Sequence, residues 1–233
     1  MVHPALAASC VLIYKIYILM SALRPYLQAK SLGLFLICLC AWIVAGGIML
    51  SLEEDRSLFR FFNGLHTPFL DRVMPALTTL GEGVFIVCAL SALLLLKRYR
   101  NWRFFLLMAG CILTPFLVVQ GLKNIFVAPR PIAYFDQASW IHIVEGQTVH
   151  RSLSFPSGHT AGIFSAICFF SFVLPRRYAP VIVILFLLGL AVGISRMYLA
   201  QHFFSDVYAG SLISVAVTLL VFSLLQRRLK VGL

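Results

Sequence analysis

The chain has 233 residues, of which 61% are hydrophobic and only 12% are charged. About a quarter of the residues in an ordinary soluble domain are charged, so this composition excludes such a domain and indicates an integral membrane protein. A formal net charge of +11 would suit nucleic acid, but the basic residues flank apolar runs, which fits lipid head groups and membrane topology instead. We therefore expect no nucleic-acid partner, and the length suits a single helical bundle.

The first 31 residues precede the main apolar runs. Their apolar part follows no charged stretch and is interrupted by Lys15, which is not the pattern of a cleaved signal peptide. We expect a helix over residues 5–23 that lies at the membrane or dips into it, and the sequence leaves open whether it spans. We divide the chain into this segment, a six-helix membrane domain (32–226) and a basic cytoplasmic tail (227–233).

Six runs without charged residues follow. A spanning helix needs about 20 apolar residues; the second run is shorter, but its helix can extend upstream through "VMPALTTLGEG", with Glu82 near the surface. The fourth run begins as a loop, and its helix is expected to start near Gly158. The sequence therefore predicts an all-α, polytopic membrane protein with a bundle of six transmembrane helices. The runs cover residues 31–52, 83–96, 104–122, 152–175, 178–195 and 207–226.

An interfacial amphipathic helix is predicted within residues 53–76, where "RSLFRFFNGLHTPFLDRVM" mixes apolar and basic positions at helical spacing. Such a helix lies in the membrane plane with its aromatic face in the lipid and its cations near head groups. We expect Phe59, Phe61 and Phe62 to be buried in this way, with Arg56 and Arg60 at the head groups.

Lysine and arginine mark the cytoplasmic loops of a membrane protein. If the residues before the first predicted span lie inside, basic residues concentrate on the inner side and all eight acids lie on the other side. We therefore expect both termini in the cytoplasm of a bacterial inner-membrane protein, with the functional site on the periplasmic face. The inner residues are Arg24, Lys30, Lys97, Arg98, Arg100, Arg103, Arg176, Arg177, Arg227, Arg228 and Lys230.

Three polar clusters lie at the outer ends of the predicted helices three to six. "KNIFVAPRP" places Lys123 seven residues before Arg130, and "PSGH" opens the fourth helix. "SRMYLAQHFFSD" adds Arg196 at the junction of the last two helices. Charges at membrane depth are costly and point to function. Three converging cations need an anion to offset them, and phosphate fits because arginine and lysine bind its oxygens well.

The other residues of these clusters suit phosphoryl chemistry. Ser157 and Gly158 stand at a helix start, where backbone N–H groups and the helix dipole bind anions. His202 and Asp206 are four residues apart, so on a helix the carboxylate can orient the imidazole for attack on phosphorus. His159 can then protonate the leaving oxygen. Neither a metal nor a cofactor is expected, since the cations neutralise the charge.

With these motifs the chain resembles the type 2 phosphatidic acid phosphatase superfamily, which also includes the vanadium haloperoxidases. The signature of that family is Lys-x6-Arg-Pro, then Pro-Ser-Gly-His, then Ser-Arg-x5-His-x3-Asp. The resemblance covers roughly residues 50 to 226, and no signature position departs from the pattern. The matching residues are Lys123, Arg130, Pro131, Pro156, Ser157, Gly158, His159, Ser195, Arg196, His202 and Asp206.

The resemblance implies a six-helix bundle with a metal-independent phosphatase site at its outer face. His202 would be the nucleophile that forms a phosphohistidine, Asp206 its orienting partner and His159 the general acid. Integral-membrane members act on lipid phosphates such as phosphatidic acid, phosphatidylglycerol phosphate, undecaprenyl pyrophosphate and lipid A phosphates. The phosphoryl group would be held by Lys123, Arg130, Ser157, Gly158 and Arg196.

Residues 131–155 could form a lid over such a site. Its aromatic and basic residues either meet a head group or, as we favour, pack and anchor the loop. A lipid phosphotransferase on the same site, a non-catalytic lipid-phosphate transporter and a haloperoxidase stay as alternatives, and the sequence does not indicate an oligomeric state. The residues of the loop in question are Tyr134, Phe135, Trp140, Ile141, His142, His150 and Arg151.

Overall fold

A computed structural model describes residues 21, 23–28, 31–136 and 138–231. The helix expected over residues 5–23 falls almost entirely outside these residues, and the division of the chain into three parts stays a prediction. The helices are α2 (Leu32–Leu52), α3 (Asp55–Gly64), α4 (Leu70–Thr78), α5 (Gly83–Ser91), α6 (Trp102–Phe126), α7 (Pro131–Tyr134), α8 (Gly158–Val173), α9 (Ala179–Tyr198) and α10 (Phe204–Leu229), with short 3-10 turns η1 (Thr79–Gly81), η2 (Ala92–Leu95) and η3 (Arg176–Tyr178).

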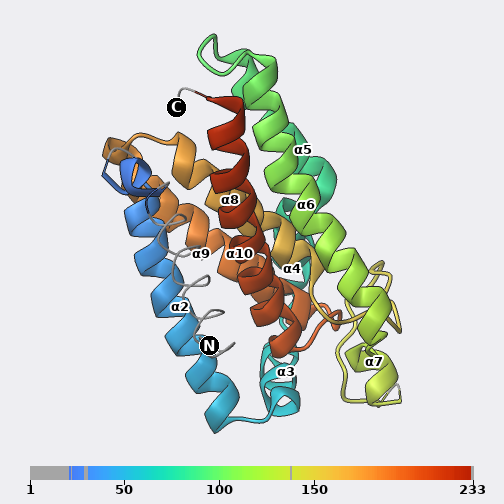
Figure 1. The fold of residues 1–233 in the computed structure, drawn as a ribbon. Coiled ribbons are helices and arrows are strands. Elements are labelled where there is room, and N and C mark those ends of the chain that lie inside the picture. The colour runs from blue at the N-terminus through green and yellow to red at the C-terminus, as the bar shows by residue number, and fades with distance from the viewer. Residues whose placement is uncertain (1–20, 22, 29–30, 137, 232–233) are drawn as a thin grey trace, which may run out of the picture.

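The described part of the chain is the predicted helical membrane bundle (Figure 1). Four segments, built on α2, α6, α9 and α10, are long and apolar enough to cross a membrane, and α4 with α5 forms a bent pair that makes a fifth. The remaining predicted span, the fourth in chain order (152–175), corresponds to α8, which is apolar but only 16 residues long. The protein is therefore a multi-pass membrane protein, and six is an approximate count of its spans.

The second predicted span is not one continuous helix, so that prediction was wrong. The chain bends by 58° between the α4–η1 segment and the α5–η2 segment. Glycines stand on both sides of Glu82, and the first of them, Gly81, packs against His159 of α8 so closely that a Cβ atom would lie 3.0 Å from the backbone oxygen of that residue. The break thus lets the chain approach α8 at the level of the predicted site.

Helix α8 forms the centre of the bundle. It begins at Gly158, as predicted, because the Ser157 side chain accepts a hydrogen bond from the Thr160 N–H and caps the helix. Its aromatic residues Phe164, Phe169 and Phe172 are fully buried. A helix that is apolar on all sides is expected in the interior, and α8 packs against α6, α9 and α10.

The two ends of the bundle differ in charge. The turn between α5 and α6, the turn before α9 and the C-terminal end of α10 lie at the same end, and α3 and α7 lie at the opposite end (Figure 1). The first end carries the basic residues that predict a cytoplasmic side, among them Lys97, Arg176 and Arg227. Which end faces the cytoplasm stays a prediction.

The predicted interfacial helix corresponds to α3, and burial in lipid was the wrong prediction for Phe59. Its position at the membrane surface and the head-group contacts of Arg56 and Arg60 stay predictions. Phe59 of α3 is fully buried against the protein's own aromatic rings, including Phe135 and Trp140, rather than in lipid. Phe61 is 61% exposed. The two arginines of α3 lie over rings of the 131–155 loop, Arg56 over Tyr134 and Arg60 over Trp140. Helix α3 therefore anchors this loop, because aromatic faces attract both the rings and the guanidinium groups.

Candidate active site

A cavity of about 500 Å³ opens between α5, α6 and α8, at the end of the bundle that carries α3 and α7. All three predicted polar clusters contribute to its lining. Lys123 comes from the end of α6, His159 from the start of α8, and His202 from the turn between α9 and α10. The signature residues that line the cavity are Lys123, Arg130, Gly158, His159, Arg196 and His202.

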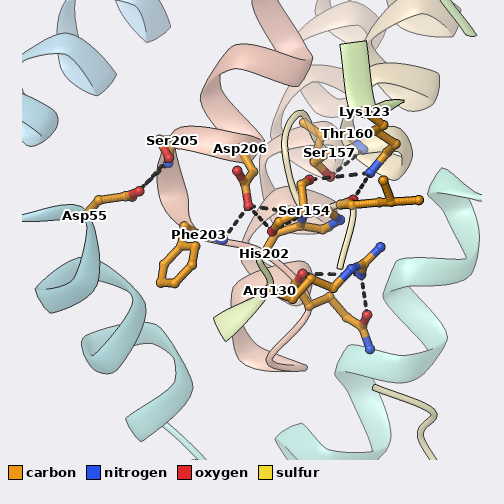
Figure 2. A network of polar contacts seen from close by, with 12 residues as sticks. Asp55, Lys123, Arg130, Ser154, Ser157, Thr160, His202, Phe203, Ser205 and Asp206 are labelled. Carbon is orange, nitrogen blue, oxygen red and sulfur yellow. Dashed lines mark hydrogen bonds and ion pairs between the residues drawn. The ribbon is translucent and has the colours of Figure 1, made fainter. Parts of the chain in front are cut away.

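The first cluster is positioned by the end of α6. Val127 follows the helix in the left-handed conformation (φ 44°), which turns the chain toward Arg130. The ammonium group of Lys123 donates hydrogen bonds to the carbonyls of Leu153 and Ser154. Arg130 donates to the Ser152 carbonyl at 2.9 Å. Both cations are at least nine-tenths buried. Their hydrogen bonds point them to the loop that leads into α8 (Figure 2).

The third cluster brings an imidazole and a carboxylate together. Nδ1 of His202 lies 3.3 Å from Oδ2 of Asp206. The same carboxylate oxygen accepts hydrogen bonds from the Ser154 hydroxyl and, at 2.9 Å, from the Phe203 N–H (Figure 2). His202 and Asp206 are only 1% and 3% exposed. A carboxylate held in this way fixes the orientation of the ring and keeps its proton on Nδ1, so that Nε2 is free.

Arg196 has a buried side chain that is only partly hydrogen-bonded. It is 7% exposed, and its Nη1 donates to the Thr78 hydroxyl at 2.8 Å. Its Nε is buried without a hydrogen-bond partner among the described residues. Because an unpaired buried donor is costly, a guanidinium in this state is suited to an anionic ligand in the cavity.

In the second cluster, some residues line the cavity and Ser157 makes hydrogen bonds that hold the fold together. Gly158 and His159 line the cavity. The N–H of Ser157, in contrast, donates to the Asp206 carbonyl at 2.9 Å, and its hydroxyl oxygen accepts from Thr160. Gly210 allows Ser157 to lie this close to α10, since a Cβ atom at position 210 would lie 2.6 Å from the backbone carbonyl oxygen of Ser157. The phosphate contact expected of Ser157 stays a prediction. It would have to be made by the hydroxyl hydrogen, because the N–H and the hydroxyl oxygen already have partners.

Burial and nearby charge keep His202 neutral. Burial is the largest cause that lowers the pKa of His202 well below its usual value, followed by the positive charges of Arg196, Arg130 and Lys123. A neutral imidazole has the free lone pair that a nucleophile needs.

In the described part of the chain, no group of three or more His, Cys, Asp or Glu side chains is arranged to hold a metal ion.

Several residues of the site were not predicted. Gln201, 3% exposed, accepts from Arg130 Nη1 at 2.6 Å and donates to the Thr148 carbonyl, so it ties that arginine to the 131–155 loop. Ser154 and Gln201 are adjacent to signature motifs, and a buried polar residue beside a motif is the signal that could have identified them. Thr78 and Glu82 belong to the helix break, which periodicity did not reveal.

The loop residues divide between packing and the cavity. Tyr134, Phe135, Trp140 and Ile141 pack with α3 or with one another. His142 lies 2.7 Å from an oxygen of Asp71, which also accepts from the Tyr198 hydroxyl, so it anchors the loop to α4 and α9. His150 is exposed and lines the cavity.

Comparison with known proteins agrees with this arrangement. The family model of the PAP2 superfamily matches residues 103–230, a stretch that contains all of the signature residues. The chain belongs to the PAP2 superfamily. The match begins after α5, so the helix break at Glu82 lies outside it.

Two curated relatives of this PAP2 protein are lipid phosphatases. A lipid A 4'-phosphatase of Bacteroides thetaiotaomicron is 28% identical over 69% of this chain and 72% of its own length. Phosphatidylglycerophosphatase B of Bacillus subtilis is 29% identical over 77% of this chain and 86% of its own length. The chain is therefore a lipid phosphatase of the PAP2 superfamily.

Solved structures share the fold. The crystal structure of Aquifex aeolicus LpxE superposes with a TM-score of 0.59 at 27% identity, covering 71% of this chain and 92% of that chain. A transmembrane PAP2-type phosphatidylglycerolphosphate phosphatase from Bacillus subtilis superposes with a TM-score of 0.56 at 24% identity, covering 82% of this chain and 94% of that chain. The helical membrane bundle is thus that of known PAP2 phosphatases.

Proposed function

We propose that this PAP2 protein removes phosphate from a membrane lipid phosphate without a metal ion, through a phosphohistidine on His202. The observation that carries the proposal is the composition of the cavity, which is cationic at one end and apolar at the other. Lys123, Arg130 and Arg196 line the cationic end, where the imidazoles of His159 and His202 also lie.

The apolar end suits the tails of a lipid. Along α6 the lining residues Ile112, Phe116 and Val119 recur at helical spacing over three turns before Lys123. Ile86 of α5 and Ala161 of α8 face the same space. At a rise of about 1.5 Å per residue, the apolar stripe on α6 extends roughly 16 Å below the cationic end. A lipid can therefore place its phosphate among the cations while its tails stay in apolar surroundings.

The cations hold the phosphoryl group and stabilise charge in the transition state. Among the described residues, the buried Nε of Arg196 has no hydrogen-bond partner, and the guanidinium of Arg130 is held by Gln201 and the Ser152 carbonyl. Preorganised donors of this kind lower the barrier because they need no rearrangement as charge develops on the phosphoryl oxygens. They supply the neutralisation that would otherwise require a metal ion.

Catalysis then proceeds in two steps. Nε2 of His202 attacks phosphorus, the bond between phosphorus and the ester oxygen breaks, and His159 gives its proton to that oxygen. Water next attacks the phosphohistidine and returns a proton to His159, the P–N bond breaks, and inorganic phosphate leaves. Asp206, fixed by Ser154 and the Phe203 N–H, stabilises the imidazolium of His202 in both steps.

The basic residues support an orientation for this chemistry. We place both termini in the cytoplasm of a bacterial inner membrane, because the lysines and arginines of the loops gather at the end opposite to the cavity. The cavity then opens at the outer leaflet. Cysteines introduced at exposed positions of 97–103 should be labelled from the cytoplasmic side, and labelling of the same positions from outside would contradict the orientation.

The test is a panel of lipid phosphates given to purified protein in detergent with excess chelator. Phosphatidic acid, phosphatidylglycerol phosphate, lipid A phosphates and undecaprenyl pyrophosphate are scored for free phosphate and for phosphorylated acceptor lipid. We expect free phosphate from at least one of them, with inhibition by vanadate. Strict dependence on added magnesium would contradict the cation-only mechanism, and transfer to a second lipid without free phosphate would identify a phosphotransferase.

A further inference from the structure

One acidic residue lines the otherwise cationic end of the cavity. Glu82 stands in the break between η1 and α5, at the N-cap position of α5, yet its side chain makes no capping hydrogen bond. Among the described residues it forms neither a hydrogen bond nor a salt bridge with another side chain, and it is exposed. The carboxylate lies near enough to Arg196 to attract its charge, but it forms no ion pair with it among the described residues, so its oxygens are available to a ligand.

The neighbours of Glu82 place it on the side of the leaving group. Gly81, the preceding residue, packs against His159, which we assign as the acid that protonates the leaving oxygen. Four residues before Glu82, Thr78 holds Arg196. One turn after it, Ile86 lines the apolar part of the cavity. Glu82 therefore lies where the group bonded to the reacting phosphate passes from His159 toward the tail region.

We propose that Glu82 determines the leaving-group preference of this enzyme, a proposal that rests on the phosphatase function proposed above. Its carboxylate accepts hydrogen bonds from hydroxyl or ammonium groups on an alcohol leaving group and repels a leaving phosphate. The preferred substrates are therefore phosphate monoesters whose head group carries hydrogen-bond donors, such as a sugar or a glycerol. Lipid diphosphates, whose leaving group is itself a phosphate, are disfavoured.

The physical reason is the sign of the charge at that position. A carboxylate and a phosphate a few ångströms apart repel each other, and because solvent screens the exposed Glu82, the repulsion corresponds to about tenfold in a rate or affinity. Hydrogen bonds between a charged acceptor and a hydroxyl are, in contrast, stronger than those between neutral groups. The same side chain thus favours one class of leaving group and opposes the other.

Three substrates with identical acyl chains isolate this effect. Phosphatidic acid is a monoester without a hydroxyl beside the leaving oxygen, phosphatidylglycerol phosphate adds such a hydroxyl, and diacylglycerol diphosphate has a phosphate leaving group. Purified wild-type protein, Glu82→Gln, Glu82→Asp and Glu145→Gln are compared by kcat/KM. Glu145 is an exposed acid of the outer loop that does not line the cavity, so it is the matched control.

We expect Glu82→Gln to raise kcat/KM for the diphosphate relative to phosphatidic acid by about tenfold and to lower the relative value for phosphatidylglycerol phosphate. Glu82→Asp, which keeps the charge, should retain the wild-type preference, and Glu145→Gln should not change it. Unchanged ratios in Glu82→Gln would overturn the proposal.

Equal changes for all three substrates would also overturn it, because Glu82 would then only offset the charge of the cations. Release of phosphate from none of the three by the wild-type protein is a different result. It would contradict the proposed function itself, and the leaving-group proposal with it.

Discussion

The cavity has two walls of different origin. One wall is built by the ends of α6 and α8 and the turn between α9 and α10, lies within the residues matched by the PAP2 family model, and carries the two imidazoles and the three cations. The other wall is the break between α4 and α5, lies outside those residues, and contributes Gly81 and Glu82. Thr78 of the same break does not line the cavity but holds Arg196. The groups proposed for bond cleavage thus lie within the motifs, while Thr78, which holds Arg196, and Glu82, the proposed selectivity residue, lie at a helix break.

The largest effect is expected on the motif wall. His202→Ala removes the nucleophile, so phosphate release should fall by at least about 10³-fold, while His66→Ala, an exposed histidine of the same end, should retain most activity. Phosphate release from a lipid phosphate measures both variants. Comparable activity of His202→Ala and wild type would remove the basis for assigning chemistry to this wall.

His159 should matter according to the leaving group. His159→Ala is expected to lower kcat/KM by about 10²- to 10⁴-fold for alkyl lipid phosphates, because an alkoxide needs a proton as it leaves. An aryl phosphate with a good leaving group should lose far less. Equal losses for both kinds of substrate would contradict the role of general acid.

The break wall should have a moderate effect through Arg196. Thr78→Val removes the hydrogen bond to this buried guanidinium, and we expect kcat/KM to fall by about tenfold or more, mainly through a higher KM. Thr78→Ser keeps the hydroxyl and should restore most of the loss.

Thr79→Val is the matched control for this test, since the Thr79 hydroxyl donates to a carbonyl of its own helix. Similar losses in Thr78→Val, Thr78→Ser and Thr79→Val would mean that the break supports only the fold and not the position of Arg196.

The smallest effect is a shift in pH dependence. Because burial and the cations lower the pKa of His202, the imidazole stays neutral below the usual histidine range near about 6.5, and activity falls only when the pH drops through that lowered pKa. Arg130→Gln removes one of the cations, so the pKa of His202 should rise and the acid limb of kcat/KM should move to higher pH. The ionisation of the substrate affects wild type and Arg130→Gln equally, so it does not contribute to the difference between their acid limbs. An acid limb at the same pH in both would contradict the electrostatic account.

The motif wall could be predicted from the sequence better than the wall at the helix break. The start of α8 at Gly158 and the convergence of three clusters could be derived, because spans and charges determine which ends of the helices meet. The break at Glu82 was not predicted, although Gly81, Glu82 and Gly83 interrupt the apolar sequence, because the bend accompanies the packing of Gly81 against His159, which the sequence does not show. The contacts of Phe59 could not be predicted either, because a ring buried in protein and a ring buried in lipid give the same periodicity in the sequence.

The polar residues that support the site show a second limit. Ser154 and Gln201 are ordinary polar residues in the sequence, and only the fold brings the serine to Asp206 and the glutamine to Arg130. Their roles depend on contacts across 52 and 71 residues of chain. Spacing within a motif gives no information about such pairs.

The most direct measurement is the capture of the covalent intermediate. His159→Ala is mixed with an aryl phosphate labelled with radioactive phosphorus and denatured at once in base, in which phosphohistidine survives. Since water activation also depends on His159, label should accumulate on the peptide that contains His202 and be absent when His202→Ala is added. Turnover without label on that peptide, or label on another residue, would contradict the account.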